Sequence, residues 1–195
     1  ERTYDIAHNR IEKFMPDNTV RLPDFVVPVG ATAGQTLARL CMDGARKLGF
    51  ADNIQYAARL KREVEVIENR GFSKYFLTMK AIADRATETQ LVGPGRGSAA
   101  GSLVAYALGI TQVDPIKYGL QFERFLTKGG SGYPDIDYDV ADPMVLKEEL
   151  IQDWGDDTVV PITNWNTLQL RSLVKDISKF YGVPFNEVNE VTGKM

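Results

Sequence analysis

The 195 residues suffice for one or two domains, and the contents of 44% hydrophobic and 25% charged residues are ordinary for a globular protein. The net charge of −3 and the pI near 5.3 argue against a strongly basic nucleic-acid coat, although a local basic face stays compatible with DNA binding. One cysteine and one histidine exclude an internal disulfide framework and a Cys/His zinc site, and no apolar run is long enough to span a membrane.

The first half of the chain is predicted to be mainly helical. Prolines interrupt residues 1–30, which predicts loops and short extended pieces there. Apolar residues at helical spacing predict three helices, at 36–48, 54–69 and 75–86. In the second of these, Leu60, Val64 and Ile67 form the apolar side, and Glu63 is expected to point away from it.

The second half begins with a glycine-rich turn at 93–97. The turn leads into residues 98–108, which are apolar almost all round and predict a buried helix that Gly109 ends. Residues 134–140 alternate acidic with apolar side chains, which predicts a strand. Amphipathic patterns predict three more helices, at 117–126, 145–154 and 168–180.

The acidic strand is a candidate metal site. Residues two apart share one face of a strand, so Asp135, Asp137 and Asp139 are expected to point the same way and to repel one another unless a cation lies between them. Oxygen ligands suit Mg²⁺ or Mn²⁺, and such carboxylates can converge on two metals about 4 Å apart. The alternative is a solvated strand face. An EF-hand is excluded, because Val140 and Leu146 stand where Gly and Glu are required.

The glycine-rich turn is a candidate phosphate site. Ser98 is expected to cap the helix that follows, and Arg96 can donate two hydrogen bonds to a phosphate, so the turn predicts a triphosphate cradle. The alternative is a tight turn that leads into a core helix. A dinucleotide fingerprint is disfavoured, because 89–92 is a poor buried strand and Asp114 precedes Pro115 where a second strand should end.

The two motifs belong to a longer pattern of six segments. These are VGPGRGSAAGSLVAY at 92–106, GIT at 109–111, VDP at 113–115, YGL at 118–120, FERFL at 122–126 and PDIDYD at 134–139. In order and spacing they resemble the C-family DNA polymerases, the bacterial DNA polymerase III alpha subunits. Weaker similarity extends over roughly residues 55–190, and the middle third of this region is highly specific.

The resemblance implies a fold and a catalytic centre. The fold would be α+β, with a palm of the polymerase-beta nucleotidyltransferase type at 1–143, including an irregular lead-in, and a truncated helical thumb at 144–195. Asp135 and Asp137 would be the catalytic residues that bind two Mg²⁺ ions, with Mn²⁺ as an alternative, and Asp139 would be a supporting acid.

The resemblance also implies ligand contacts. Gly97 and Ser98 match the pair that holds the triphosphate of the incoming nucleotide, with Arg96 beside them. Arg124 is a candidate active-site contact, and an ion pair with a palm carboxylate is the alternative. Three basic residues share one face of the last predicted helix and are candidates for DNA phosphate contacts or for a solvated charged face: Arg171, Lys175 and Lys179.

The implied function is template-directed DNA synthesis in replication. A primer 3′-hydroxyl would attack the α-phosphate of a deoxynucleoside triphosphate (dNTP) and release pyrophosphate. The implied partners are primer–template DNA, a dNTP, the remaining parts of the polymerase and, through regions absent here, a sliding clamp. The implied location is the cytoplasm of a bacterium or of a phage-infected bacterium.

The chain departs from the family pattern in several places. Residues 127–133 replace a segment that usually reads Asn-Pro-Glu-Arg, and Val140 stands where Phe is usual, which favours a divergent member such as a phage protein. The family's third catalytic Asp lies beyond residue 195, and the first residue is Glu1, so we expect a part of a longer protein that is inactive alone. The alternatives are a non-catalytic split segment that binds DNA or nucleotide, and a different polymerase-beta-like nucleotidyltransferase. The latter would take its third carboxylate from Asp153, Asp156 or Asp157.

Overall fold

The computed structural model describes residues 2–6, 8, 25–130, 132–160, 162, 167 and 169–194. The chain divides into two compact units, Glu1–Trp154 and Gly155–Met195. Apart from the short helix α1 (Arg2–Asp5), most of the predicted irregular lead-in lies outside the described residues. The predicted boundary between palm and thumb stays a prediction.

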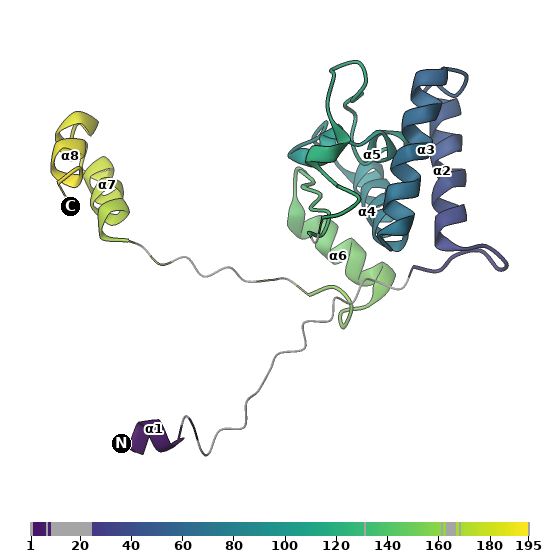
Figure 1. Ribbon diagram of the computed structural model, residues 1–195. Helices are drawn as coiled ribbons and strands as arrows, with labels where there is room; N and C mark the ends of the chain where they lie inside the picture. Colours follow the sequence, from purple (N-terminus) through teal and green to yellow (C-terminus); the bar gives the residue numbers. More distant parts are fainter. Residues whose placement is uncertain are drawn as a thin grey trace. The chain divides into compact units, whose positions relative to one another are not determined.

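A group of packed helices forms the first unit. Helix α2 (Ala33–Lys47) contacts α3 (Ile54–Asn69), α4 (Ser73–Thr89) and the short α5 (Leu103–Ala107), and α3 also contacts α5 (Figure 1). Their apolar faces meet in one core, whose largest fully buried side chains include Leu37, Ile67, Phe76, Leu103 and Phe122. Burial of this apolar surface is the main favourable contribution to the stability of the unit.

Local signals set the ends of the first helices. Thr32 and Gln35 form a capping box, which starts α2 three residues before its predicted first residue. The Asn53 side chain accepts a hydrogen bond from the backbone at the start of α3, so this helix has the predicted bounds. One prediction within α3 is wrong. Glu63 is fully buried, because it lies on the same face as Leu60.

The predicted helix at 98–108 is two elements. A 3₁₀ helix, η2 (Ser98–Gly101), precedes α5, because the Ser102 side chain accepts a hydrogen bond from Ala105 N at 3.1 Å and so starts a new helix. The expectation that Ser98 caps this helix is therefore wrong. The predicted helix at 117–126 is also wrong. Turns that end at Gly119 (φ 64°) precede a second 3₁₀ helix, η3 (Phe122–Arg124).

The acidic segment does not form the predicted strand. Across the described residues the only β pairing is an isolated antiparallel bridge between Val92 and Val140. Backbone bonds flank it, from Gly93 N to Asp139 O and from Ala141 N to Leu91 O, but no longer ladder of bonds continues along residues 134–138. The described structure is therefore mostly helical, and it does not confirm an α+β palm, since a strand needs a neighbour along several residues.

Three further helices complete the description. Helix α6 (Pro143–Trp154) belongs to the first unit and contacts α4, where Thr89 donates a hydrogen bond to Glu149 at 3.1 Å. In the second unit α7 (Leu170–Phe180) packs against α8 (Phe185–Thr192). Among the described helices none is both long and apolar enough to cross a membrane.

Candidate functional site

The acidic segment has the two-sided character that its sequence predicts. Asp135, Asp137 and Asp139 are exposed, whereas Ile136 is buried and Tyr138 is half-buried. The period of two along the backbone therefore places three carboxylates toward solvent and the apolar side chains toward the helices.

Helix α4 carries the apolar side of the acidic segment. The Tyr138 hydroxyl donates to Ala83 O at 3.4 Å, and Tyr75 forms a hydrogen bond with the backbone of Ile136. Burial raises the pKa of both tyrosines above the ordinary value, so both hydroxyls stay protonated at neutral pH. These contacts hold the segment along α4 and leave the carboxylates of Asp135 and Asp137 exposed to solvent.

The glycine-rich turn lies directly against the acidic segment. Gly93 N donates to Asp139 O at 2.8 Å, and Arg96 Nη1 lies 3.1 Å from Asp139 Oδ1. A Cβ atom added to Gly97 would lie only 2.5 Å from Asp137 Oδ2. Gly97 also has φ 64° and ψ −160°, a conformation that is essentially restricted to glycine. The fold thus brings the two candidate motifs into contact.

The Arg96–Asp139 ion pair leaves Arg96 available to an anion. Both side chains are more than half exposed, at 65% and 56%. Exposed pairs of this kind contribute little to stability and exchange readily with other partners. A phosphate group at the turn could therefore replace Asp139 as the partner of the Arg96 guanidinium with little loss of free energy.

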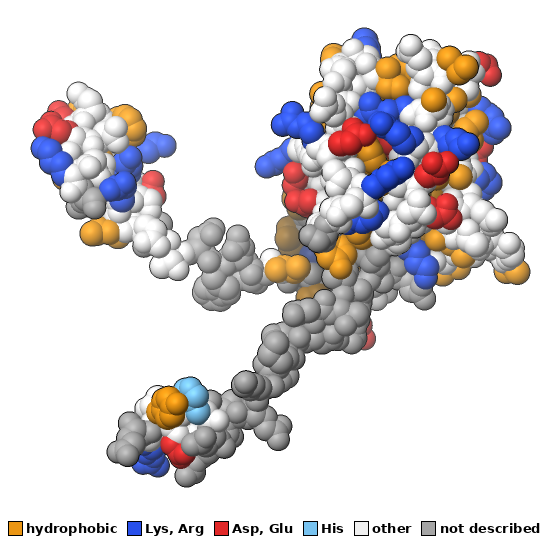
Figure 2. All heavy atoms as spheres, in the orientation of Figure 1, with side chains coloured by type: hydrophobic (Ala, Val, Ile, Leu, Met, Phe, Trp, Pro, Cys, Tyr) orange, Lys and Arg blue, Asp and Glu red, His pale blue; other side chains and the backbone are white. Residues whose placement is uncertain are grey.

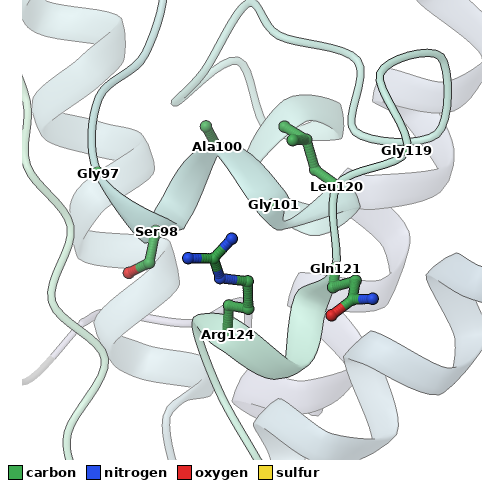
Figure 3. Close-up of a pocket in the computed structure, with 8 residues that line it drawn as sticks. All are labelled: Gly97, Ser98, Ala100, Gly101, Gly119, Leu120, Gln121 and Arg124. Carbon is green, nitrogen blue, oxygen red and sulfur yellow. The ribbon is translucent and has the colours of Figure 1, made fainter.

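A cleft of about 580 Å³ opens next to the turn. Its lining comes from two sides of the fold: Gly97, Ser98 and Gly101 in and before η2, and Leu120, Gln121 and Arg124 in and before η3. In Figure 3 the Arg124 guanidinium lies close to Ser98 and to the η2 ribbon. The structure therefore places Arg124, Ser98 and Gly97 around one cleft, although they come from separate sequence motifs.

One side chain that the sequence reasoning missed holds the segment before the acidic residues. Arg70 donates to Thr127 O at 2.5 Å and to Gly132 O at 2.6 Å, and its guanidinium lies 5.3 Å from the centre of the Phe72 ring. The segment directly before the acidic residues, where the sequence departs from the family pattern, is thus held by hydrogen bonds at the end of α3. No sequence signal identifies this contact, because both acceptors are backbone carbonyls.

A second missed feature is the buried pair of Arg59 and Glu63 behind the cleft. Arg59 Nε donates to Glu63 Oε1 at 2.7 Å. The spacing of four residues on a helix is a signal for an ion pair, and it could have been read from the sequence.

The candidate metal ligands are Asp135 and Asp137. Their exposed carboxylates offer the hard oxygen donors that Mg²⁺ prefers, so the residues present fit part of a magnesium site. Within the described residues no group of three or more His, Cys, Asp or Glu side chains is arranged to hold a metal ion. Asp153, a candidate third carboxylate, is instead 3.3 Å from Arg85 Nε.

The surface carries charges of both signs in the first unit and a basic stripe on α7. Figure 2 shows Lys and Arg side chains interspersed with Asp and Glu on the visible face of the first unit, as expected for a weakly acidic chain. We call Arg171, Lys175 and Lys179 the basic stripe. Its two outer members are exposed, and the Nζ atom of the half-buried Lys175 lies 5.7 Å from the centre of the Phe185 ring.

Comparisons with known proteins agree with the resemblance in the sequence. Residues 35–195 match the family model described as the bacterial DNA polymerase III alpha NTPase domain. The DNA polymerase III subunit alpha of Bacillus subtilis is 41% identical over 176 residues, 88% of this chain and 16% of the relative. That of Aquifex aeolicus is 38% identical over 198 residues, which cover 97% of this chain and 17% of the relative. That of Ureaplasma parvum is 34% identical over 200 residues, which cover 95% and 21%. The chain thus spans about a fifth or less of the length of these relatives.

Proposed function

This chain belongs to the bacterial DNA polymerase III alpha family, and from this membership we propose that it supplies the nucleotide-binding turn and two metal-binding carboxylates of a replicative DNA polymerase. The observation that supports the proposal best is the contact between Gly97 and Asp137. A candidate phosphate-binding turn beside one of two candidate metal-binding carboxylates is an arrangement that fits metal-assisted nucleotidyl transfer.

In the proposed reaction Asp135 and Asp137 would hold two Mg²⁺ ions, or Mn²⁺ ions. When bound, these ions would lower the pKa of the primer 3′-hydroxyl and neutralise charge on the triphosphate. The chain's own groups position the substrate. Gly97 and Ser98 approach the triphosphate closely, because glycine has no side chain in the way. Asp139 supports the site by holding Arg96 beside the turn.

Arg124 is proposed as a second cation for the triphosphate. It lines the same cleft as Ser98. The acid next to it in the sequence, Glu123, forms its ion pair with Arg62, at 3.0 Å. A guanidinium can donate two parallel hydrogen bonds to a phosphate and thereby oppose the charge that develops during transfer.

The proposed partners follow from the same function. The basic stripe would contact phosphates of primer–template DNA, as a thumb does, since exposed Lys and Arg side chains mainly supply sequence-independent affinity. A dNTP is the second substrate. Other parts of a polymerase, and a sliding clamp bound through regions outside these residues, are the proposed protein partners in the cytoplasm of a bacterium or of a phage-infected bacterium.

The proposal is tested by a chimera in which this chain replaces the matching region of the Bacillus subtilis relative. Primer extension with Mg²⁺ should be abolished by Asp135→Asn and by Asp137→Asn, with DNA binding retained in both. Asp43→Asn, on the exposed face of α2, is the matched control and should extend primers like the unsubstituted chimera. Near-normal extension by either active-site variant would contradict the assignment.

We further propose that the 195-residue chain does not extend primers by itself. Within the described residues, Asp135 and Asp137 belong to no group of three or more His, Cys, Asp or Glu side chains that could hold a metal ion. Extension by the isolated chain would show that the two aspartates suffice or that another group completes the site. Primer extension by the chimera distinguishes a polymerase part from a non-catalytic binding segment. A polymerase part makes the unsubstituted chimera active, whereas a non-catalytic segment leaves it inactive.

A further inference from the structure

A single guanidinium joins the two walls of the candidate nucleotide cleft. Arg59 Nη2 donates to Gly101 O at 2.7 Å and to Leu120 O at 3.0 Å. Gly101 lies at the end of η2, and Leu120 lies just before η3, so the two acceptors belong to opposite walls. The walls meet at this point, since a Cβ atom on Gly101 would lie 2.7 Å from Gln121 O.

Glu63 fixes the orientation of Arg59. Its Oε1 atom accepts from Arg59 Nε at 2.7 Å, and its Oε2 atom accepts from Ser102 Oγ at 3.0 Å and from Val104 N at 3.1 Å. The carboxylate therefore connects the arginine to the start of α5. Lysine could not reproduce this arrangement, because it lacks the planar fork that directs Nε and Nη2 to different partners.

The ion pair of Arg59 and Glu63 lies where a protein core usually has apolar side chains. Glu63 is fully buried and the Arg59 side chain is 17% exposed. Burial raises the pKa of Glu63, while the hydrogen bonds from Arg59, Val104 and Ser102 act in the opposite direction. Apolar residues can replace many buried ion pairs without loss of stability, so stability alone is a weak explanation for a pair at this place.

We propose that Arg59, oriented by Glu63, is a positioning residue that fixes the separation of the two cleft walls and thereby the affinity for a nucleoside triphosphate. The ligand class rests on the function proposed above. The positioning itself rests on the hydrogen bonds from one guanidinium to both walls. Arg59 touches neither the turn at Gly97 nor the acidic segment in the contacts described, so its effect passes through Gly101 and Leu120.

The test compares Arg59→Lys with Arg46→Lys in the 195-residue chain. Arg46 is a matched control, because it also forms a helical ion pair, with Asp43 at 3.0 Å, but its side chain is 66% exposed and lies far from the cleft walls in sequence. Amide hydrogen exchange should accelerate about tenfold in residues 98–102 and 119–124 of Arg59→Lys, with α2 and α4 unchanged. The dissociation constant for dATP with Mg²⁺ should rise roughly tenfold.

The outcomes separate the inference from the function on which it rests. Exchange in both walls equal to that of Arg46→Lys would overturn the positioning role. Accelerated exchange in a chain whose unsubstituted form binds no dATP would support the positioning of the walls and overturn its effect on triphosphate affinity. The proposed function is decided separately, by primer extension with the chimera. If Arg59→Lys does not fold, Glu63→Gln serves instead. Its single amide oxygen can still accept from Ser102 and Val104, but its amide nitrogen then faces Arg59 Nε, so the charge and the acceptor beside Arg59 are both lost. This variant should therefore also loosen the same two walls.

Discussion

Replacing Gly97 with alanine should weaken the candidate site through two separate physical effects. The first is backbone strain, because φ 64° with ψ −160° is a region that only glycine occupies readily, and a side chain there costs about 1–3 kcal/mol. The second is a clash, because the new methyl group would lie 2.5 Å from Asp137 Oδ2. The carboxylate would have to withdraw by roughly 1 Å to restore an ordinary contact.

Two measurements follow from these effects. Thermal unfolding should show a fall in Tm of roughly 2–12 °C, as expected for that loss of free energy in a chain of this size. Binding of Mn²⁺ followed by electron paramagnetic resonance should weaken severalfold, because the methyl group displaces the Asp137 carboxylate. Gly129→Ala is the control, since a Cβ atom there meets nothing within 4 Å. A Gly97→Ala chain with the Tm and the Mn²⁺ affinity of the control would refute the described contact.

Three further predictions concern other parts of the chain. Ser102→Ala removes the cap of α5 and the bond to Glu63, and should lower the free energy of unfolding by about 1–3 kcal/mol in urea titrations; a change within error would contradict the cap. Burial raises the pKa of Cys41 to about 12, so the thiol should stay protonated and resist thiol reagents from pH 8 to pH 10 until the chain unfolds; labelling of the folded chain at the rate of the urea-unfolded chain would refute its burial. Changing the basic stripe to alanine should reduce the slope of log affinity for duplex DNA against log salt by about 2–3, and an unchanged slope would favour a merely solvated face.

The sequence predicts those features that depend on neighbours along the chain. The bounds of α3 are predictable because Asn53 caps its start and Gly71 follows its end. The exposure of Asp135 and Asp137 depends only on the period of two, so it too can be read from the alternation with apolar residues. Membership of the polymerase family follows from the order and spacing of short motifs, and the comparisons confirm it.

The features that the sequence does not predict depend on contacts between distant residues. Glu63 lies on the buried face of α3 together with Leu60, and its carboxylate is satisfied there by hydrogen bonds from Ser102 and Val104 at the start of α5. Helical periodicity contains no information about these two partners. The break between η2 and α5 has a local cause in Ser102, but apolar periodicity conceals it. The predicted strand at 134–140 fails to form for a third reason. Alternation predicts an extended backbone, whereas a ladder also needs a partner, and Val140 pairs with Val92 alone among the described residues.

The isolated bridge between Val92 and Val140 has a consequence for the order of folding. It joins segments that are far apart in the sequence, so it closes a long loop. The loss of chain entropy on closure is large compared with the free energy that one bridge contributes. The hydrogen bonds within α2, α3 and α4 join near neighbours in the sequence, so these helices can form earlier. We therefore expect these helices to form before Ile136 and Tyr138 are buried. The two halves of the candidate site would then meet only in the last step of folding.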